Sequence, residues 1–180
     1  MKIGKYILFF LILTSIVNGQ SISNEEKFVI EQFKAKKNII YTDKIWPSDI
    51  DNIREALSAK SKITTWDYRR NKEKDEDIPN QINFTNSELK FVLKQIEKNN
   101  KKGWAKNKLP NDQFISRDSL TALSKKGMFF NEYSFSKPVF IRNETICIFY
   151  SDGNEFGELS VFIKHKDNWI YYSRFFQWVS

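Results

Sequence analysis

The chain has 180 residues, with 29 Lys or Arg against 22 Asp or Glu, a single Cys and a single His. One Cys excludes an internal disulfide framework and a cysteine-rich zinc module, and one His excludes a multi-histidine metal site. Aromatic residues make up 16% of the chain, which is too many for an ordinary disordered protein. The length of 180 residues predicts one domain that is large enough to bury a hydrophobic core.

The N-terminus has the three regions of an export signal. Two lysines precede an uncharged apolar run at residues 7–17, and the small residue Gly19 precedes Gln20 at the expected cleavage site. The run is too short for a spanning helix, which needs about 20 residues, and no Cys follows the cleavage site, so we do not expect a lipoprotein. The sequence predicts a signal peptide over 1–19 and export to the periplasm or the extracellular space. An uncleaved membrane anchor and a buried helix are the alternatives.

Four segments have the periodicity and end signals of amphipathic helices, at about residues 24–37, 48–60, 86–100 and 117–126. Ser23 with Glu26, and Thr85 with Glu88, form capping-box patterns. The third segment is the most regular, because its apolar residues follow helical spacing: Leu89, Val92, Leu93 and Ile96. Residues 39–41 suit either a short strand or a buried connection. Residues 67–83 are polar and charged, which predicts a solvated loop.

From residue 132 onward the pattern changes to strands. Four runs are rich in β-branched and aromatic residues, at 133–141, 144–151, 158–164 and 168–178. Short turns separate them, which predicts antiparallel neighbours. We therefore predict a single α+β domain over 20–180, with a helical part at about 24–127 and a sheet part at about 132–179. Its expected architecture is N-terminal amphipathic helices packed on one face of a C-terminal four-stranded antiparallel β-meander.

The excess positive charge is concentrated in residues 90–108, which hold seven Lys and one Glu, a net of +6. Four of these lysines recur at three- and four-residue steps and so share one face of the third helix. A candidate anion-binding surface follows from this pattern: Lys90, Lys94, Lys98, Lys101, Lys102, Trp104, Lys106 and Lys108. The alternative is the ordinary polar face of an amphipathic helix, with Trp104 in the core.

The last predicted strand is aromatic on both of its faces. Its large side chains form a candidate interaction face: Trp169, Tyr171, Tyr172, Phe175, Phe176 and Trp178. Either the strand is central and covered on both sides, or one face is open as an interaction patch. A bulge near Ser173 and Arg174 would change which residues share a face.

The C-terminal sheet region resembles an uncharacterised family of small exported proteins of Flavobacterium-type bacteria. The resemblance rests on five stretches: SFSKPVF at 134–140, ICIFY at 146–150, GEL at 157–159, KDNW at 166–169 and QWVS at 177–180. It implies an exported compartment and a fold, but no activity. The family's hairpin usually carries two Cys, and here residues 152–159 carry none, so no role of those Cys transfers. We expect Gly153 and Gly157 to serve a tight hairpin.

No catalytic constellation is visible in the sequence. Cys147 lies in an apolar run and is expected to be a buried small hydrophobe, and His165 is expected in a solvated turn. No phosphate loop, nucleophile elbow or metal motif is present, so we expect no cofactor.

These observations leave three hypotheses for the function. The first is a non-enzymatic exported binding or envelope-associated protein, whose partner is an envelope component or another protein; export makes nucleic acid an unexpected partner. The second is an exported hydrolase-like enzyme with an unrecognised carboxylate pair between sheet and helices. The third is an anionic-polymer or membrane-surface binder that uses residues 90–108.

Overall fold

The structure is a computed structural model, and it describes residues 22–34, 40–59, 62–64, 78–105, 113–128, 132–153 and 156–179. The predicted signal peptide and its cleavage site lie outside these residues, as do residues 67–77 of the predicted loop. Among the described residues, no helix has both the length and the apolar character needed to cross a membrane.

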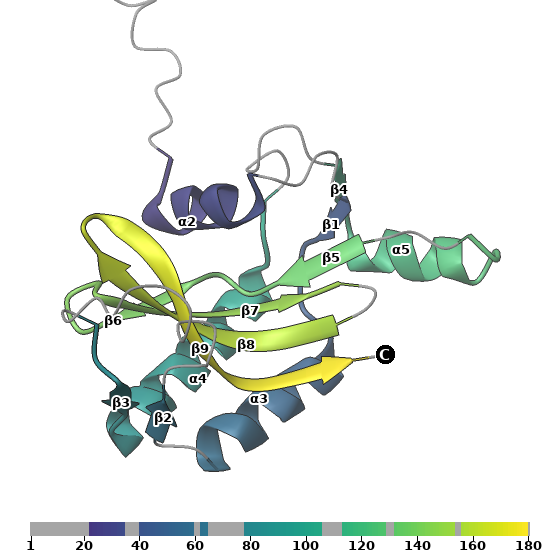
Figure 1. Cartoon of the computed structure of the whole chain (residues 1–180). Helices are drawn as coiled ribbons and strands as arrows, with labels where there is room; N and C mark the ends of the chain where they lie inside the picture. The colour runs from purple at the N-terminus through teal and green to yellow at the C-terminus, as the bar shows by residue number, and fades with distance from the viewer. Residues whose placement is uncertain are drawn as a thin grey trace, which may run out of the picture.

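A seven-stranded mixed sheet forms the centre of the fold (Figure 1). Six strands follow one another across it in the order β4 (Gln113–Ile115), β1 (Ile40–Thr42), β5 (Glu132–Phe135), β7 (Ile146–Asp152), β8 (Phe156–His165) and β9 (Asn168–Val179). The seventh, β6 (Val139–Ile141), also pairs with β7. Strands β7, β8 and β9 are antiparallel, whereas β1 runs parallel to both β4 and β5.

The predicted four-stranded antiparallel meander is therefore wrong, although the α+β class holds. Two three-residue strands, β1 and β4, extend the sheet in parallel at one edge, and runs so short carry almost no periodic signal in the sequence. The first predicted strand is also divided into β5 and β6, because residues 136–138 interrupt it and shift the register on β7 by one residue. Pro138 lies in this interruption, where the missing backbone N–H is tolerated.

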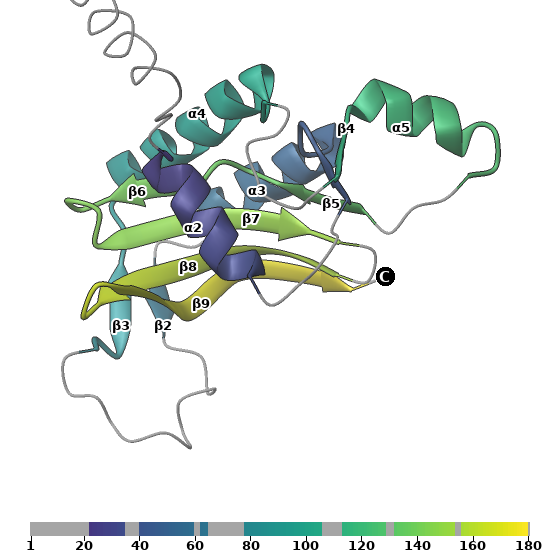
Figure 2. The ribbon, with the colours of Figure 1, turned by 90° about the horizontal axis from the view of Figure 1, so that it is seen from above.

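The helices lie on both faces of the sheet, not on one as predicted. Helix α2 (Asn24–Phe33) crosses one face, and α3 (Pro47–Ala59) and α4 (Asn86–Lys102) lie on the other (Figures 1 and 2). The short α5 (Arg117–Ser124) projects beyond the β5 end of the sheet (Figure 2). A two-stranded sheet of β2 (Lys62–Thr64) and β3 (Gln81–Asn83) lies beside the α4 face, so the end of the predicted loop 67–83 forms a strand instead.

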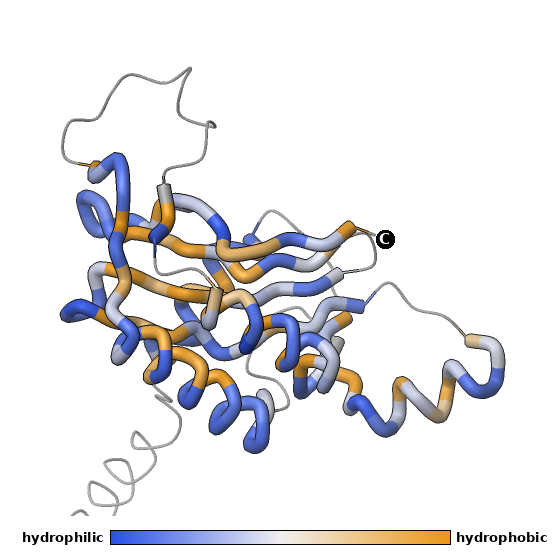
Figure 3. The backbone as a smooth tube through the Cα atoms, turned by 90° about the horizontal axis from the view of Figure 1, so that it is seen from below, coloured by the Kyte–Doolittle hydropathy of each residue, from blue (hydrophilic) through white to orange (hydrophobic). Residues whose placement is uncertain are grey.

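Local capping explains where two of these helices begin. The predicted capping boxes of Ser23 with Glu26 and of Thr85 with Glu88 are both confirmed. Hydrophilic and hydrophobic residues alternate along α4 with the helical period (Figure 3). The buried side chains of α4 face the sheet: Leu89, Val92 and Ile96.

Two hydrophobic clusters hold the sheet between its helices. The cluster on the α3 and α4 side is mainly aliphatic, and the cluster on the α2 side is mainly aromatic. Phe28 of α2 lies at the centre of the aromatic cluster, with ring centroids 5.3 Å from Phe149 and 5.0 Å from Phe162 in edge-to-face geometry. Cys147 is fully buried here as a free thiol whose pKa is raised by burial, as expected of a small hydrophobe.

The two glycines of the predicted hairpin allow close packing of aromatic side chains. A Cβ at Gly157 would lie 2.3 Å from Nε1 of Trp178, and a Cβ at Gly153 would lie 2.8 Å from the ring of Tyr133. Neither glycine has a positive φ. A side chain at either position would therefore displace an aromatic ring from the adjacent strand.

Candidate functional site

The aromatic residues of β9 are divided between the two clusters. Trp169 and Tyr171 pack on the α2 side, whereas Tyr172, Phe175 and Phe176 pack on the α3 and α4 side. Trp178 donates from its indole nitrogen to the Tyr150 hydroxyl at 3.4 Å. Of the six residues of the candidate aromatic interaction face, Tyr172 and Phe175 are buried and the other four are half-buried.

Strand β9 is nevertheless an edge strand, not a central one. Its pairing with β8 shifts register on each side of Ser173 and Arg174, where the sequence predicts a bulge. In these shifts the register with β8 passes over Phe175 and Tyr172. Such bulges twist an edge strand and hinder its pairing with another chain.

The lysines of the candidate anion-binding surface lie on the outer side of α4. All five that the structure describes are exposed: Lys90, Lys94, Lys98, Lys101 and Lys102. Trp104 does not join them, because it is 6% exposed and donates from its indole nitrogen to the Phe135 carbonyl at 3.0 Å. Lys106 and Lys108 lie outside the described residues.

A pocket of about 430 Å³ opens beside β3, at the end of the sheet where β7 begins and β8 ends. Three isoleucines, from β3, β7 and β8, give it an apolar floor, and polar and basic side chains line the rest. The lining residues are Pro79, Gln81, Ile82, Asn83, Arg142, Thr145, Ile146, Ile163, Lys164 and His165. His165, predicted as a solvated turn residue, thus ends β8 and faces this pocket.

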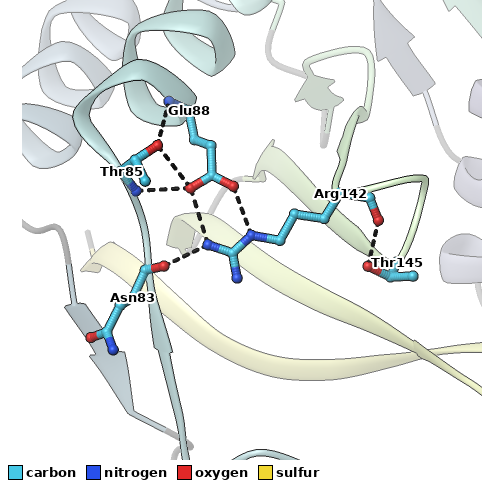
Figure 4. Close-up of polar contacts among 5 residues, drawn as sticks. All are labelled: Asn83, Thr85, Glu88, Arg142 and Thr145. Atoms are coloured by element: carbon cyan, nitrogen blue, oxygen red, sulfur yellow. Dashed lines mark hydrogen bonds and ion pairs between the residues drawn. The ribbon is translucent and has the colours of Figure 1, made fainter.

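Arg142 is held at the pocket by the N-terminus of α4 (Figure 4). Its Nε lies 2.7 Å from Oε1 of Glu88, and its Nη2 donates both to Oε2 of Glu88 at 3.0 Å and to the Asn83 carbonyl. Glu88 is fixed in turn by the Thr85 backbone N–H, which donates to its Oε2 at 2.8 Å. The hydrogen bond from Arg142 and those from Thr85 lower the pKa of Glu88 to about 2.

This arrangement leaves one end of the guanidinium free to bind a ligand. Nε and Nη2 of Arg142 are used within the protein, whereas Nη1 makes no hydrogen bond to any described residue. A guanidinium carries five N–H donors in a fixed plane. Two of those donors, at Nη1, therefore remain available on a group whose position is already set.

The turn that carries Arg142 is strained. Arg142, Asn143 and Glu144 have φ values of 51°, 53° and 59°, so three successive residues with side chains adopt the left-handed region. Each costs of the order of 1 kcal/mol. Thr145 closes the turn by donating from its hydroxyl to the Arg142 carbonyl at 2.7 Å, and its own carbonyl accepts from the Lys164 N–H at 2.8 Å. The β8–β9 turn also has positive φ, at Lys166 and Asp167, because tight hairpins between twisted strands favour this conformation.

A second polar cluster lies at the opposite end of β7, on the α3 side. Asp49, from the first turn of α3, is 6% exposed and accepts a hydrogen bond from the Trp46 N–H at 3.2 Å. Asp152 ends β7 and accepts from the Ser134 hydroxyl at 3.5 Å through Oδ2, while its buried Oδ1 has no hydrogen-bond partner among the described residues. The guanidinium of Arg117 lies nearby and stacks 4.0 Å from the ring centroid of Trp46.

The electrostatics of this cluster make it hard to ionise. Burial and then the neighbouring Asp49 carboxylate raise the pKa of Asp152 from 3.8 to about 7, against the lowering effects of Ser134 and Arg117. The pKa of Asp49 is also raised, mainly by burial. The Asp49 carboxylate therefore disfavours the charged form of Asp152.

The two sites have different chemical capacities. The pocket contains three side chains that can carry positive charge and no Asp or Glu among its lining residues, which suits recognition of an anion. The acid cluster has a carboxyl group with a pKa near neutrality, which suits proton transfer, but neither Asp49 nor Asp152 lines the pocket. No group of three or more metal-ligating side chains occurs in the described ranges.

Comparison with protein-family models, with curated proteins and with solved structures finds no match for this chain.

The sequence predicts a turn at residues 142–143, but it contains no signal for the pairing of Arg142 with Glu88, which are 54 residues apart. The acids Asp49 and Asp152 are still farther apart and lie in an ordinary helix start and strand end. Only the Lys pattern of α4 was recognisable, because it repeats within one helix.

Proposed function

We propose that this protein is an exported, non-enzymatic binding protein whose pocket holds a small ligand with an anionic group and an apolar body. The observation that carries the proposal is the pocket lining, in which every ionisable side chain is basic: Arg142, Lys164 and His165. Arg142 offers the two donors of Nη1, and Lys164 is an exposed cation on the same rim. A carboxylate, sulfate or phosphate matches this pair.

The rest of the pocket favours a ligand that is only partly polar. Ile82, Ile146 and Ile163 form its floor, and Pro79 adds apolar surface at its edge. A volume of about 430 Å³ lies within the ordinary range for small-molecule sites. The ligand class that fits is therefore a small amphipathic acid, with its charged end at Arg142 and its apolar body over the isoleucines.

Two features of the sequence support the exported part of the proposal. The N-terminal 19 residues follow the pattern of a signal peptide, and the C-terminal stretches resemble a family of exported proteins. In that compartment the ligand or partner would be an envelope component or a small molecule outside the cytoplasm.

The test uses octanoate, 1-octanol and octylamine as probes that share one chain and differ in charge. Isothermal titration calorimetry on the mature chain is expected to show binding of octanoate, with weaker binding of octanol and octylamine. Lys164→Gln should weaken octanoate binding about fivefold, the equivalent of ~1 kcal/mol. Lys125→Gln, which removes an exposed lysine beyond α5, is the matched control and should not change it.

Two results would contradict the proposal. Equal affinity for the acid and the alcohol would show that the pocket does not recognise charge. Equal effects of Lys164→Gln and Lys125→Gln would show that the charge effect does not come from the pocket.

One observation favours a second function, the carboxylate-dependent enzyme. Asp152 has a pKa of about 7, the range of a general acid or base at neutral pH, and lies beside Asp49 and the Tyr150 hydroxyl. A panel of chromogenic esters and glycosides tests this function on the wild-type chain, on Asp152→Asn and on Asp167→Asn, a change in an exposed turn. Turnover that only Asp152→Asn abolishes would establish the enzyme; no turnover, or turnover that survives in this variant, would reject it.

A further inference from the structure

The outward side of α4 forms a continuous basic face. It consists of Lys90, Phe91, Lys94, Lys98, Lys101 and Lys102, all exposed. With 3.6 residues per turn, Phe91, Lys94 and Lys98 follow i, i+3, i+7 spacing and form its central stripe. The buried stripe of the helix, which includes Val92 and Ile96, lies on the opposite side against the sheet.

The two acids of α4 lie at the borders of this basic face and are already paired with arginines. Glu88 pairs with Arg142 on one side, at 2.7 Å. Glu97 pairs with Arg54 of α3 on the other, at 2.8 Å. No lysine of the basic face forms a salt bridge with any other described residue. The arginines thus neutralise the acids, and the lysines leave a positive field that points away from the protein.

Phe91 distinguishes this face from the ordinary polar side of a helix. Its side chain is 46% exposed in the middle of the lysines. In water, the exposed part of this ring gains nothing from burial. On a bilayer surface the ring can enter the acyl boundary while the lysines around it meet the headgroups, so the same residues gain both apolar burial and charge pairing.

From this combination we infer that the basic face of α4 docks on a lipid bilayer that carries anionic headgroups. The lysines favour a surface that carries negative charge. Phe91 favours a bilayer over a soluble polyanion, because a polyanion has no apolar interior for the ring. This surface is separate from the pocket, because none of its six residues lines the pocket. The protein would thus bind its small ligand while held at a membrane surface.

The experiment measures co-sedimentation of the mature chain with vesicles of phosphatidylcholine, with and without phosphatidylglycerol. Binding is expected only with phosphatidylglycerol, and it should weaken as salt is raised. The triple variant K94Q/K98Q/K101Q should lose binding by about a hundredfold, at roughly fivefold per lysine. Phe91→Ala should lose about tenfold without any change in charge.

A second triple variant, K125Q/K126Q/K166Q, is the matched control, because it removes the same charge from exposed lysines outside α4. The inference is overturned if the wild type binds vesicles equally with and without phosphatidylglycerol, or if both triple variants lose the same affinity for the vesicles. It is also overturned if Phe91→Ala binds the vesicles as the wild type does, which would assign the face to a soluble polyanion. Octanoate binding should be the same in all of these variants, so a failure here is distinct from a failure of the pocket.

Discussion

Asp152→Asn should make the protein more stable at alkaline pH. The carboxyl group of Asp152 has a pKa of about 7 in the folded chain against an ordinary value of 3.8, because burial and the Asp49 carboxylate disfavour its charge. The folded state therefore holds this proton more tightly than the unfolded state does. The stability of the wild type should fall as pH rises from about 4 to about 7 and then level off.

The size of the effect follows from the difference between the two pKa values. That difference corresponds to at most ~4 kcal/mol above pH 7. Because the side chain is only partly enclosed, solvent screening reduces the expected value to about 2 kcal/mol. At about pH 5 the folded carboxyl group is still largely neutral, so the gain there should be below ~1 kcal/mol. Asparagine has nearly the same size and retains an oxygen that accepts from the Ser134 hydroxyl.

Urea unfolding followed by tryptophan fluorescence at about pH 5 and about pH 8.5 measures these differences. Asp167→Asn is the control, since it makes the same chemical change in an exposed turn where φ is 65° and Asn is tolerated. A gain for Asp152→Asn that is no larger at the higher pH than at the lower, or equal behaviour of the two variants, would contradict a raised pKa at Asp152. In addition, Asp49→Asn combined with Asp152→Asn should gain less at pH 8.5 than the two single variants together, because either change alone removes their mutual repulsion.

Three further predictions follow from local geometry. Arg142→Gln should lower the free energy of unfolding by about 1 kcal/mol at neutral pH, as measured by urea titration. Because the pKa of Glu88 is lowered to about 2 in the folded chain, the full loss is expected above pH 4.5, and it should shrink as the pH falls toward 2. Gly157→Ala should cost ~1–3 kcal/mol and change the near-ultraviolet circular dichroism, since its Cβ would overlap the Trp178 indole; an unchanged spectrum and stability would contradict this. The thiol of Cys147 should resist alkylation until urea unfolds the protein, and rapid native labelling would show that it is not buried as described.

The parts of the fold that sequence reasoning predicted correctly depend on neighbouring residues. The start of α4 follows from Thr85 and Glu88, three positions apart, and its buried face follows from apolar residues within three turns. The long strands β7, β8 and β9 were recognisable from runs of β-branched and aromatic residues. In each case a few adjacent residues make the contacts that select the local structure.

Strand order and the candidate site depended on contacts between distant segments. The three residues of β1 have no periodicity of their own, and they become a strand because β4 and β5 supply hydrogen bonds on both sides. The β5–β6 division likewise depends on pairing with β7.

The sequence by itself indicated an aromatic-rich α+β chain with one basic segment, and its residue spacing placed lysines along one helix face. It did not show that Trp104 turns inward to the Phe135 carbonyl, or that Phe91 faces outward among those lysines. Nor did it bring Arg142 to Glu88, or Asp152 to Asp49. The physical reason is range: capping and periodicity act within a few residues, whereas burial, pKa and pocket shape are set by segments that meet only when the sheet has formed.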